Sequence, residues 1–169
     1  MRLQTKIAVL SGFWLLFSIT LANASLSIPM YAVDTNGKQK AIGQVTVEKA
    51  KCGILLTPHL RDLPPGIHGF HIHDKPSCED HAMAAAGHYD PKKTNKHSGP
   101  YKNTGHLGDL PVLIVNQDGA ATIPVLAPRL TLSTIKNHAL MIHEGGDNYS
   151  DEPEKLGGGG ARIACGIIS

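Results

Sequence analysis

Short runs of alternating apolar and polar residues, separated by glycine and proline turns, constrain the fold of this chain more than any other feature. The run AIGQVTVEKA alternates with a period of two, which is the side-chain period of a β-strand. Similar short runs are SIPMYAV, GILLTP, PVLIVN, HALMIHE and RIACGIIS. Helical periodicity is weak throughout the sequence. The pattern therefore predicts an all-β domain, built as an antiparallel sandwich or flattened barrel.

Three further segments shape this prediction. The turn Gln117-Asp118-Gly119 lies between PVLIVN and AATIPVLAP and predicts that the two runs form a β-hairpin. Residues 74–109 are rich in histidine and small residues, and residues 144–161 contain four consecutive glycines, 157–160. Loops of this length inside a compact domain are usually functional or disordered. Because the first is rich in ligand types and the second is followed closely by a cysteine, we expect both to be functional.

The first 24 residues predict a secretory signal peptide. Arg2 and Lys6 precede an apolar run at residues 7–21, and Ala22-Asn23-Ala24 has the small-x-small pattern of a cleavage site. The apolar run is shorter than the roughly 20 residues of a transmembrane helix. We therefore expect residues 25–169 to form one mature domain that has no membrane association after cleavage.

Charge and cysteine content describe that mature domain further. The chain has 16 Lys and Arg against 14 Asp and Glu, and Arg2 and Lys6 lie in the signal segment, so the mature charges balance. Nothing in this balance indicates nucleic-acid binding. Three cysteines remain, Cys52, Cys78 and Cys165. In an oxidising compartment they predict one disulfide and one further thiol.

Three histidines fall within the segment GIHGFHIH, residues 66–73. In a strand, His71 and His73 share one face and lie about 6.6 Å apart, which suits two ligands of one metal ion. His68 has the opposite parity and is expected to point away from them. Taken alone, the motif fits a metal site and three surface histidines equally well.

Other ligating side chains recur near turns and strand ends along the chain. They are His88, His97, His106, Asp109 and His143. Imidazole nitrogens suit copper and zinc, and a carboxylate in the set favours zinc. Together with the paired histidines, they predict a metal centre.

In this order, HGFHIH, GHYDP, KHSGP, GHLGD, GGDN, LGGGG and RIACG resemble the Cu,Zn superoxide dismutases of the bacterial secreted type. The resemblance covers essentially all of residues 25–169. It implies a Greek-key β-barrel of eight strands with two long functional loops, in agreement with the strand pattern. It also implies an enzyme of the periplasm, or a fully secreted one. Such an enzyme dismutates superoxide to oxygen and hydrogen peroxide by copper redox cycling and so protects the cell envelope.

The same resemblance implies one copper and one zinc per subunit, and it implies their ligands. The copper ligands fall on His71, His73, His88 and His143. The zinc ligands fall on His88, His97, His106 and Asp109. His88 belongs to both sets as a bridging imidazolate.

Further roles outside the two ligand sets follow from the resemblance. Asp147 corresponds to a carboxylate that holds one copper histidine and one zinc histidine. Arg162 corresponds to the arginine beside the copper, and the implied catalytic residues are Arg162, for the anion, and His88, for the proton. Cys78 and Cys165 correspond to the disulfide pair.

Two alternative functions compete with the dismutase. A non-catalytic protein that binds or stores copper or zinc on the same fold would tend to lose the open coordination or the arginine, whereas Arg162 and every matched ligand are present. A copper-only dismutase would lack the zinc set, which this sequence retains.

The sequence departs from the family at one place. Only ten positions separate Cys78 from His88, where secreted bacterial members commonly carry a longer segment that bears on subunit pairing, so a homodimer is left open. Within this segment, His81 and Met83 fit a transient site for a soft metal less well than they fit a solvated loop. Cys52 fits either an unpaired thiol or an intermolecular disulfide.

Overall fold

The computed structural model describes residues 25–33 and 39–169, and the predicted signal peptide lies outside this part of the chain. The described residues form nine strands and two short 3-10 turns, and the all-β prediction is confirmed. The strands are β1 (Ser25–Val33), β2 (Gln39–Lys49), β3 (Ile54–Leu60), β4 (Gly66–His68), β5 (Phe70–His73), β6 (Leu113–Val115), β7 (Val125–Ala127), β8 (His138–His143) and β9 (Arg162–Ile168). The 3-10 turns are η1 (Met83–Ala85) and η2 (Lys155–Gly158).

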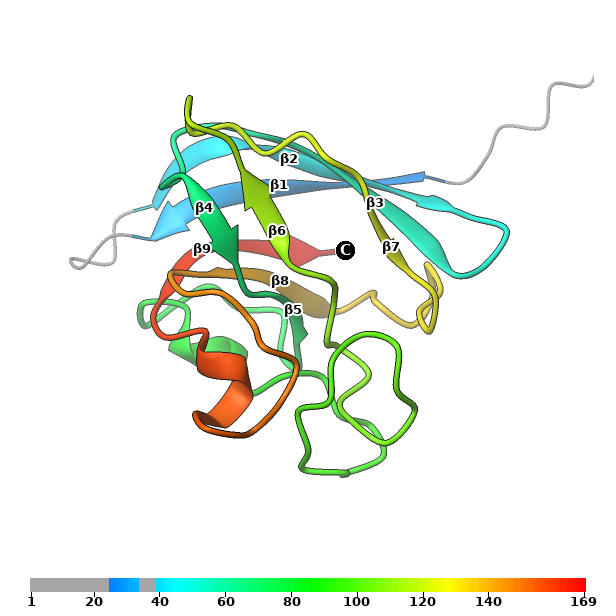
Figure 1. Cartoon of the computed structure of the whole chain (residues 1–169). Helices are drawn as coiled ribbons and strands as arrows, with labels where there is room; N and C mark the ends of the chain where they lie inside the picture. The colour runs from blue at the N-terminus through cyan, green and yellow to red at the C-terminus, as the bar shows by residue number, and fades with distance from the viewer. Residues whose placement is uncertain (1–24, 34–38) are drawn as a thin grey trace, which may run out of the picture.

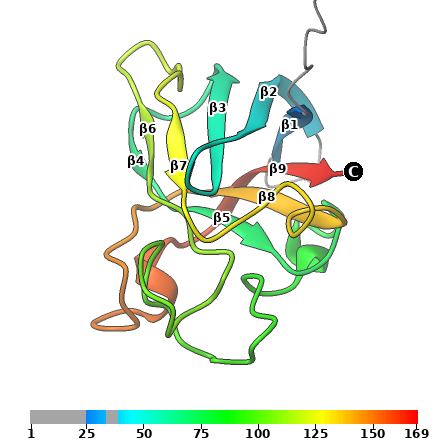
Figure 2. The same ribbon diagram turned by 90° about the vertical axis from the view of Figure 1, so that its right-hand side faces the viewer.

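Seven strands form one curled antiparallel sheet in the order β5-β8-β9-β1-β2-β3-β7, and β4 and β6 form a separate ribbon (Figure 1). Strands β1, β2 and β3 follow one another, whereas β9 returns from the end of the chain to lie beside β1. That return is the connection of a Greek key. Strands β1 to β4, β6 and β7 lie on one side of β5, β8 and β9, and the long loops extend on the other (Figure 2).

An aliphatic core fills the inside of the curled sheet. The alternation in the sequence places Ile28 and Met30 of β1 inside, as it does Ile54 and Leu56 of β3. Burial of each such side chain contributes about 1.5 to 3 kcal/mol to the stability of the fold. Strand β5 differs because all four of its residues are buried. Such a strand must be covered on both faces, by the core on one and by the long loops on the other.

The segment GIHGFHIH, expected as one strand, is divided at Gly69. Strand β4 pairs with β6, whereas β5 pairs with β8, so the chain changes sheets at this glycine. The Gly69 N–H donates to the Gly145 carbonyl at 2.7 Å, and its carbonyl accepts from the N–H of His143 at 2.9 Å. With β4 and β5 counted as one bent strand, the fold is the expected eight-stranded barrel.

The predicted hairpin between PVLIVN and AATIPVLAP is wrong in its pairing. The turn does form, since the N–H of Gly119 donates to the Asn116 carbonyl at 3.0 Å. Beyond the turn the two runs separate, because β6 pairs with β4 and β7 pairs with β3. After the turn the chain pairs with β3, where Ala121 and Leu60 exchange two backbone hydrogen bonds of 3.1 Å.

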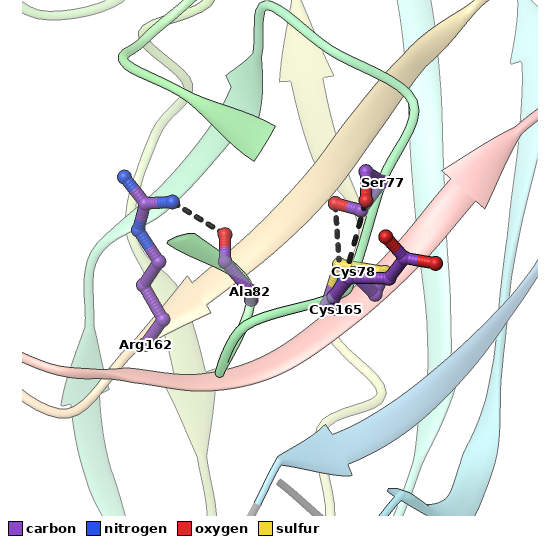
Figure 3. Close-up of a disulfide and its surroundings, with 6 residues drawn as sticks. Ser77, Cys78, Ala82, Arg162 and Cys165 are labelled. Atoms are coloured by element: carbon purple, nitrogen blue, oxygen red, sulfur yellow. Dashed lines mark hydrogen bonds between the residues drawn. A yellow bond between two sulfur atoms is a disulfide. The ribbon is translucent and has the colours of Figure 1, made fainter. Parts of the chain in front are cut away.

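Two long loops lie outside β5 and β8, in agreement with the sequence-based expectation (Figure 1). One joins β5 to β6 and the other joins β8 to β9. A disulfide between Cys78 and Cys165 ties the first loop to β9, with the two Cα atoms 5.8 Å apart (Figure 3). The implied pairing is therefore confirmed, and Cys52 is exposed and outside it.

Candidate metal centre

The two neighbouring strands β5 and β8 supply the first part of the centre. Phe70 and Ile72 of β5 belong to the hydrophobic core, and His71 and His73 alternate with them. As expected for residues two apart in a strand, the rings of these histidines lie 6.5 Å apart between centroids. His143 ends β8, where the backbone contact with Gly69 holds it beside β5.

Two groups of four buried side chains gather around this pair of strands and share His88. Within each group, one ligating atom per residue lies within 4.8 Å of every other. The four-histidine cluster consists of His71, His73, His88 and His143. The histidine–aspartate cluster consists of His88, His97, His106 and Asp109. The structure thus brings together every residue that the sequence suggested as a ligand.

The histidine–aspartate cluster has the spacing of a tetrahedral metal site. Asp109 Oδ1 lies 3.0 Å from His88 Nδ1, 3.1 Å from His97 Nδ1 and 3.4 Å from His106 Nδ1. Ligands of a tetrahedral zinc ion with bonds of 2.0 to 2.1 Å lie about 3.3 Å apart. His97 Nδ1 and His106 Nδ1 are buried and make no hydrogen bond to any residue that the structure describes. These atoms are therefore aimed at a common point and fit a cation there.

In the four-histidine cluster, outer contacts select the nitrogen that each ring presents. His71 uses Nε2 to reach Asp147 Oδ2 at 2.8 Å, and His73 uses Nδ1 to reach the Ala86 carbonyl at 2.9 Å. His143 Nδ1 lies 3.3 Å from the Gly160 carbonyl. The nitrogens left for a metal are His71 Nδ1, His73 Nε2 and His143 Nε2. A set of imidazoles without a carboxylate fits copper.

His88 faces both clusters with one ring. Its Nδ1 lies 3.0 Å from Asp109 Oδ1, in the histidine–aspartate cluster. Within the described part of the chain, its Nε2 is buried and has no hydrogen-bond partner, like the Nδ1 of His71. The His88 ring stacks on that of His71, with 4.0 Å between centroids. One imidazole therefore offers a nitrogen to each of two metal ions.

Asp147 joins the clusters from outside. Its side chain is fully buried; Oδ2 accepts from His71 Nε2 at 2.8 Å, and Oδ1 accepts from His97 Nε2 at 2.7 Å. Burial opposes the negative charge, but hydrogen bonds from His71 and His97 outweigh it and hold the pKa of Asp147 below its usual range. As a carboxylate, it fixes the orientation and tautomer of one ring in each cluster.

The two clusters have opposite preferences for protons. Burial and the neighbouring His88 lower the pKa of His71 to about 3, and burial lowers the pKa of His143 to about 4. Burial also disfavours charge on His97, but the neighbouring carboxylates of Asp109 and Asp147 outweigh it and raise the pKa of His97 to about 9. Without metal, a positive charge is thus favoured between the two carboxylates, and uncharged imidazoles are favoured in the four-histidine cluster.

Arg162 begins β9 and is the cross-strand partner of His143. Its guanidinium donates from Nη1 to the Ala82 carbonyl (Figure 3) and from Nη2, at 2.6 Å, to the Ala86 carbonyl. A surface cavity of about 380 Å³ is lined by Arg162 together with His81, Met83 and Glu144. Arg162 therefore lies both at a surface cavity and close enough to His143 for its positive charge to act on that ring.

Sequence reasoning missed the two alanines that hold Arg162. Ala82 and Ala86 both have φ of +62°, in the left-handed region, which costs a residue with a Cβ about 1–2 kcal/mol. The Ala86 carbonyl accepts from both Arg162 and His73, so it couples the arginine to the four-histidine cluster. Alanine gives no sequence signal for such a conformation.

His68 lies apart from both clusters, as its parity predicted. Its Nδ1 is 2.8 Å from the His143 carbonyl and its Nε2 is 2.8 Å from the Pro64 carbonyl. Both nitrogens are therefore engaged by backbone. His81 and Met83 are exposed at the cavity beside Arg162 and belong to neither cluster.

Comparisons with known proteins agree over most of the chain. The sequence model of the family described as copper/zinc superoxide dismutase (SODC) matches residues 41–168. Superoxide dismutase [Cu-Zn] 1 of Salmonella typhimurium is 54% identical over 157 residues, which cover 88% of this chain and 89% of that protein.

Solved structures give the same result. The Cu/Zn superoxide dismutase from Brucella abortus is 47% identical with a TM-score of 0.81, and the match covers 86% of this chain and 100% of that one. The solution structure of the monomeric copper, zinc superoxide dismutase from Salmonella enterica is 54% identical with a TM-score of 0.76. That match covers 86% of this chain and 100% of the other.

Proposed function

The chain belongs to the copper/zinc superoxide dismutase family, and on this premise we propose that the four-histidine cluster binds copper and the histidine–aspartate cluster binds zinc. The enzyme dismutates superoxide to oxygen and hydrogen peroxide and uses one copper and one zinc per subunit. The single observation that carries the assignment is His88, which presents Nε2 to one cluster and Nδ1 to the other.

When bound, copper supplies one-electron redox chemistry, and zinc, which has no redox change, supplies a fixed charge beside the shared imidazole. The protein holds the rings for both ions. Asp147 fixes the orientation of His71 and His97, and the Ala86 carbonyl fixes that of His73. Rings held in this way present their nitrogens without reorganisation.

Arg162 binds the substrate anion. Its Nη1 and Nη2 are anchored to Ala82 and Ala86, so the guanidinium cannot swing away from its place beside His143. The positive charge and the remaining N–H groups attract and orient superoxide at the edge of the four-histidine cluster. The side chain is half-buried, and burial of this kind strengthens the attraction relative to bulk water.

His88 is the proton carrier in this proposal. Its Nε2 is buried and has no hydrogen-bond partner among the described residues, so that atom, when it is not bound to copper, can take up a proton and pass it to reduced substrate. Its Nδ1 faces the histidine–aspartate cluster, where bound zinc would hold it and keep the ring in place while Nε2 exchanges its proton.

We also propose that residues 1–24 are removed on export and that residues 25–169 act in the periplasm. The support is the Ala22-Asn23-Ala24 motif behind an apolar run. The described residues contain no helix with the length and apolar character needed to cross a membrane. Mass spectrometry of a periplasmic fraction should find Ser25 at the N-terminus, and a chain that retains Met1 would contradict cleavage.

Oligomeric state is a separate question, and a homodimer stays a prediction. The Salmonella enterica relative is described as monomeric. Sedimentation equilibrium of the mature chain decides between the two states.

Superoxide decay after pulse radiolysis tests the proposed activity. In this experiment the protein is first loaded with both metals, and a chelator removes free copper. We expect fast decay that is lost in His143→Ala and retained in His59→Ala, because His59 is an exposed residue of β3 outside both clusters. Absence of decay with both metals bound would instead support a non-catalytic copper- and zinc-binding protein.

A further inference from the structure

Arg129 lies in the connection between β7 and β8, outside both metal clusters. Its guanidinium nevertheless reaches the loop between β5 and β6, which supplies the zinc ligands. Nε donates to the Pro100 carbonyl at 2.6 Å, and Nη2 donates to the carbonyls of Gly99 and His106 at 3.1 and 2.8 Å. One side chain thus contacts three backbone carbonyls that are 23 to 30 residues away in sequence.

The three carbonyls lie at the two ends of one short segment of the loop, residues 99–106. Gly99 and Pro100 follow His97 after one intervening residue, Ser98, and His106 is itself in the histidine–aspartate cluster. Residues 101–104 between them are exposed, whereas the residues on either side are buried. Arg129 therefore joins the two ends of this segment by hydrogen bonds, next to two of the four residues in the cluster.

The guanidinium of Arg129 makes no direct ion pair among the described residues, although the Asp109 carboxylate is near enough to favour its charge. No ion pair within 4.0 Å joins it to an acidic group among residues 25–33 and 39–169. Placing a guanidinium in a half-buried position without such a partner costs stability unless its donors are well used. Here the donors make charge-assisted hydrogen bonds, which are roughly twice as strong as neutral ones. Among the described residues, the side-chain hydrogen bonds of Arg129 are thus directed at the loop backbone.

We propose that Arg129 is a positioning residue for the zinc site. Its planar guanidinium holds residues 99–106 in the conformation that places His97 and His106 around Asp109. This inference rests on the proposed zinc assignment of the histidine–aspartate cluster. Neither the ligand motifs nor the family resemblance assigned a role to this arginine.

Two consequences follow when the guanidinium is removed. The buried carbonyls of Gly99, Pro100 and His106 lose their partner, and an unsatisfied buried acceptor is destabilising. The loop then samples open conformations in the metal-free protein, and zinc must order it on binding. Loss of an outer contact of this kind typically weakens metal binding about 10- to 100-fold. Lysine at this position keeps the positive charge but lacks the planar set of N–H donors, so it restores zinc affinity only in part.

The test compares metal-free wild type, Arg129→Gln, Arg129→Lys and Arg61→Gln. Arg61 is an exposed arginine and serves as the matched control. Zinc affinity is measured by competition with a chromophoric chelator. We expect Arg129→Gln to bind zinc about 10- to 100-fold more weakly and Arg129→Lys to fall between it and wild type, while Arg61→Gln stays within about twofold.

Two further readouts separate positioning from general loss of structure. The visible absorption spectrum of Co²⁺ bound in place of zinc should change in Arg129→Gln, since it reports ligand geometry. Amide hydrogen exchange should accelerate within residues 98–108 and not in β1 to β3. Copper affinity of the zinc-free protein should fall less than zinc affinity, because His71 and His73 lie on β5 and His143 lies on β8, outside this loop segment.

Wild-type zinc affinity and an unchanged Co²⁺ spectrum in Arg129→Gln would overturn the proposal. If that variant does not fold by circular dichroism, Arg129→Lys decides, and zinc binding equal to wild type would overturn it equally. Failure of the zinc assignment gives a different result. In that case the zinc affinity of the wild-type protein would not change when His106 or Asp109 is substituted.

Discussion

A Cβ atom placed on Gly157 would lie 2.1 Å from Asp147 Oδ1, the oxygen that accepts the hydrogen bond of His97. Its φ of +74° is also one that residues with a side chain rarely adopt. At this position, the glycine in the glycine-rich stretch before β9 is therefore needed for a local structural reason. It lets the backbone approach the carboxylate that holds both metal clusters.

Gly157→Ala should displace Asp147 and weaken binding of both metals. Gly158→Ala is the matched control, because its φ is +76° and a Cβ there meets only the side chain of the exposed Glu154. Both variants carry backbone strain of about 1–2 kcal/mol in unfolding free energy, but only Gly157→Ala adds the clash. Zinc and copper titrations of the two variants check this, and equal affinities would show that the close approach is unimportant.

Asp147→Asn should weaken both sites together. The carboxylate accepts from His71 and His97 through different oxygens, and an amide offers only one acceptor oxygen. We expect affinity for each metal to fall about 10- to 100-fold. Asp118→Asn, at an exposed turn residue, should leave both affinities unchanged. Loss of zinc alone would contradict the coupling of the two clusters through Asp147.

Sequence reasoning was most reliable where local periodicity decides the geometry. Two-residue spacing correctly placed His71 and His73 together and set His68 apart, because β5 is a regular strand with one face in the core. The division of that segment at Gly69 was not predictable. It depends on backbone contacts with His143 and Gly145, which are more than seventy residues away.

The rest of the centre required either the family resemblance or the structure. His88, His97 and His106 lie in a loop without periodicity, so spacing alone could not show that they converge. The left-handed conformations of Ala82 and Ala86 give no signal in an alanine-rich segment. The hairpin prediction failed because strand partners at β6 and β7 are chosen by long-range pairing with β4 and β3.

Zinc binding to the metal-free protein should release a proton and strengthen as pH rises. The pKa of His97 is raised to about 9 by its two carboxylates, so the ring is protonated near neutral pH and must lose that proton to bind zinc. Apparent zinc affinity should therefore increase about tenfold per pH unit until pH reaches about 9. Calorimetry in buffers of different ionisation enthalpy counts the protons, and a zinc affinity independent of pH over this range would contradict the prediction.

The same group sets a pH dependence of stability without metal. Because the folded-state pKa of His97 lies above the ordinary value of 6.5, its contribution is complete below pH 6.5 and is lost as pH rises through about 9. His71 and His143 act oppositely, since their lowered pKa values remove stability as pH falls from 6.5 toward about 3 and 4. Urea unfolding of the metal-free protein should show both losses, and a flat profile would contradict them.

Cys78→Ser should destabilise the protein and lower copper retention. The disulfide spans 87 positions, and the chain-entropy estimate for such a loop is about 4.5 kcal/mol, an upper expectation. It also anchors the segment whose Ala82 and Ala86 carbonyls hold Arg162. Cys52→Ser removes an exposed thiol and should leave unfolding and copper retention unchanged. A Cys78→Ser variant that retains copper like Cys52→Ser would show that the disulfide does not support the site.

Cys52 itself allows a simple check. If its exposed thiol forms an intermolecular disulfide, a non-reducing gel shows a dimer that is lost in Cys52→Ser. Monomer alone would assign it as an unpaired thiol.

The most direct test of the two-metal centre is anomalous X-ray scattering from crystals of the loaded protein, recorded at the copper and zinc edges. We predict a copper peak bounded by His71 Nδ1, His73 Nε2, His143 Nε2 and His88 Nε2. We predict a zinc peak about 2.0 to 2.1 Å from His88 Nδ1, His97 Nδ1, His106 Nδ1 and Asp109 Oδ1. The two peaks should lie on opposite sides of the His88 ring. A single metal position, or two that do not share His88, would contradict the assignment.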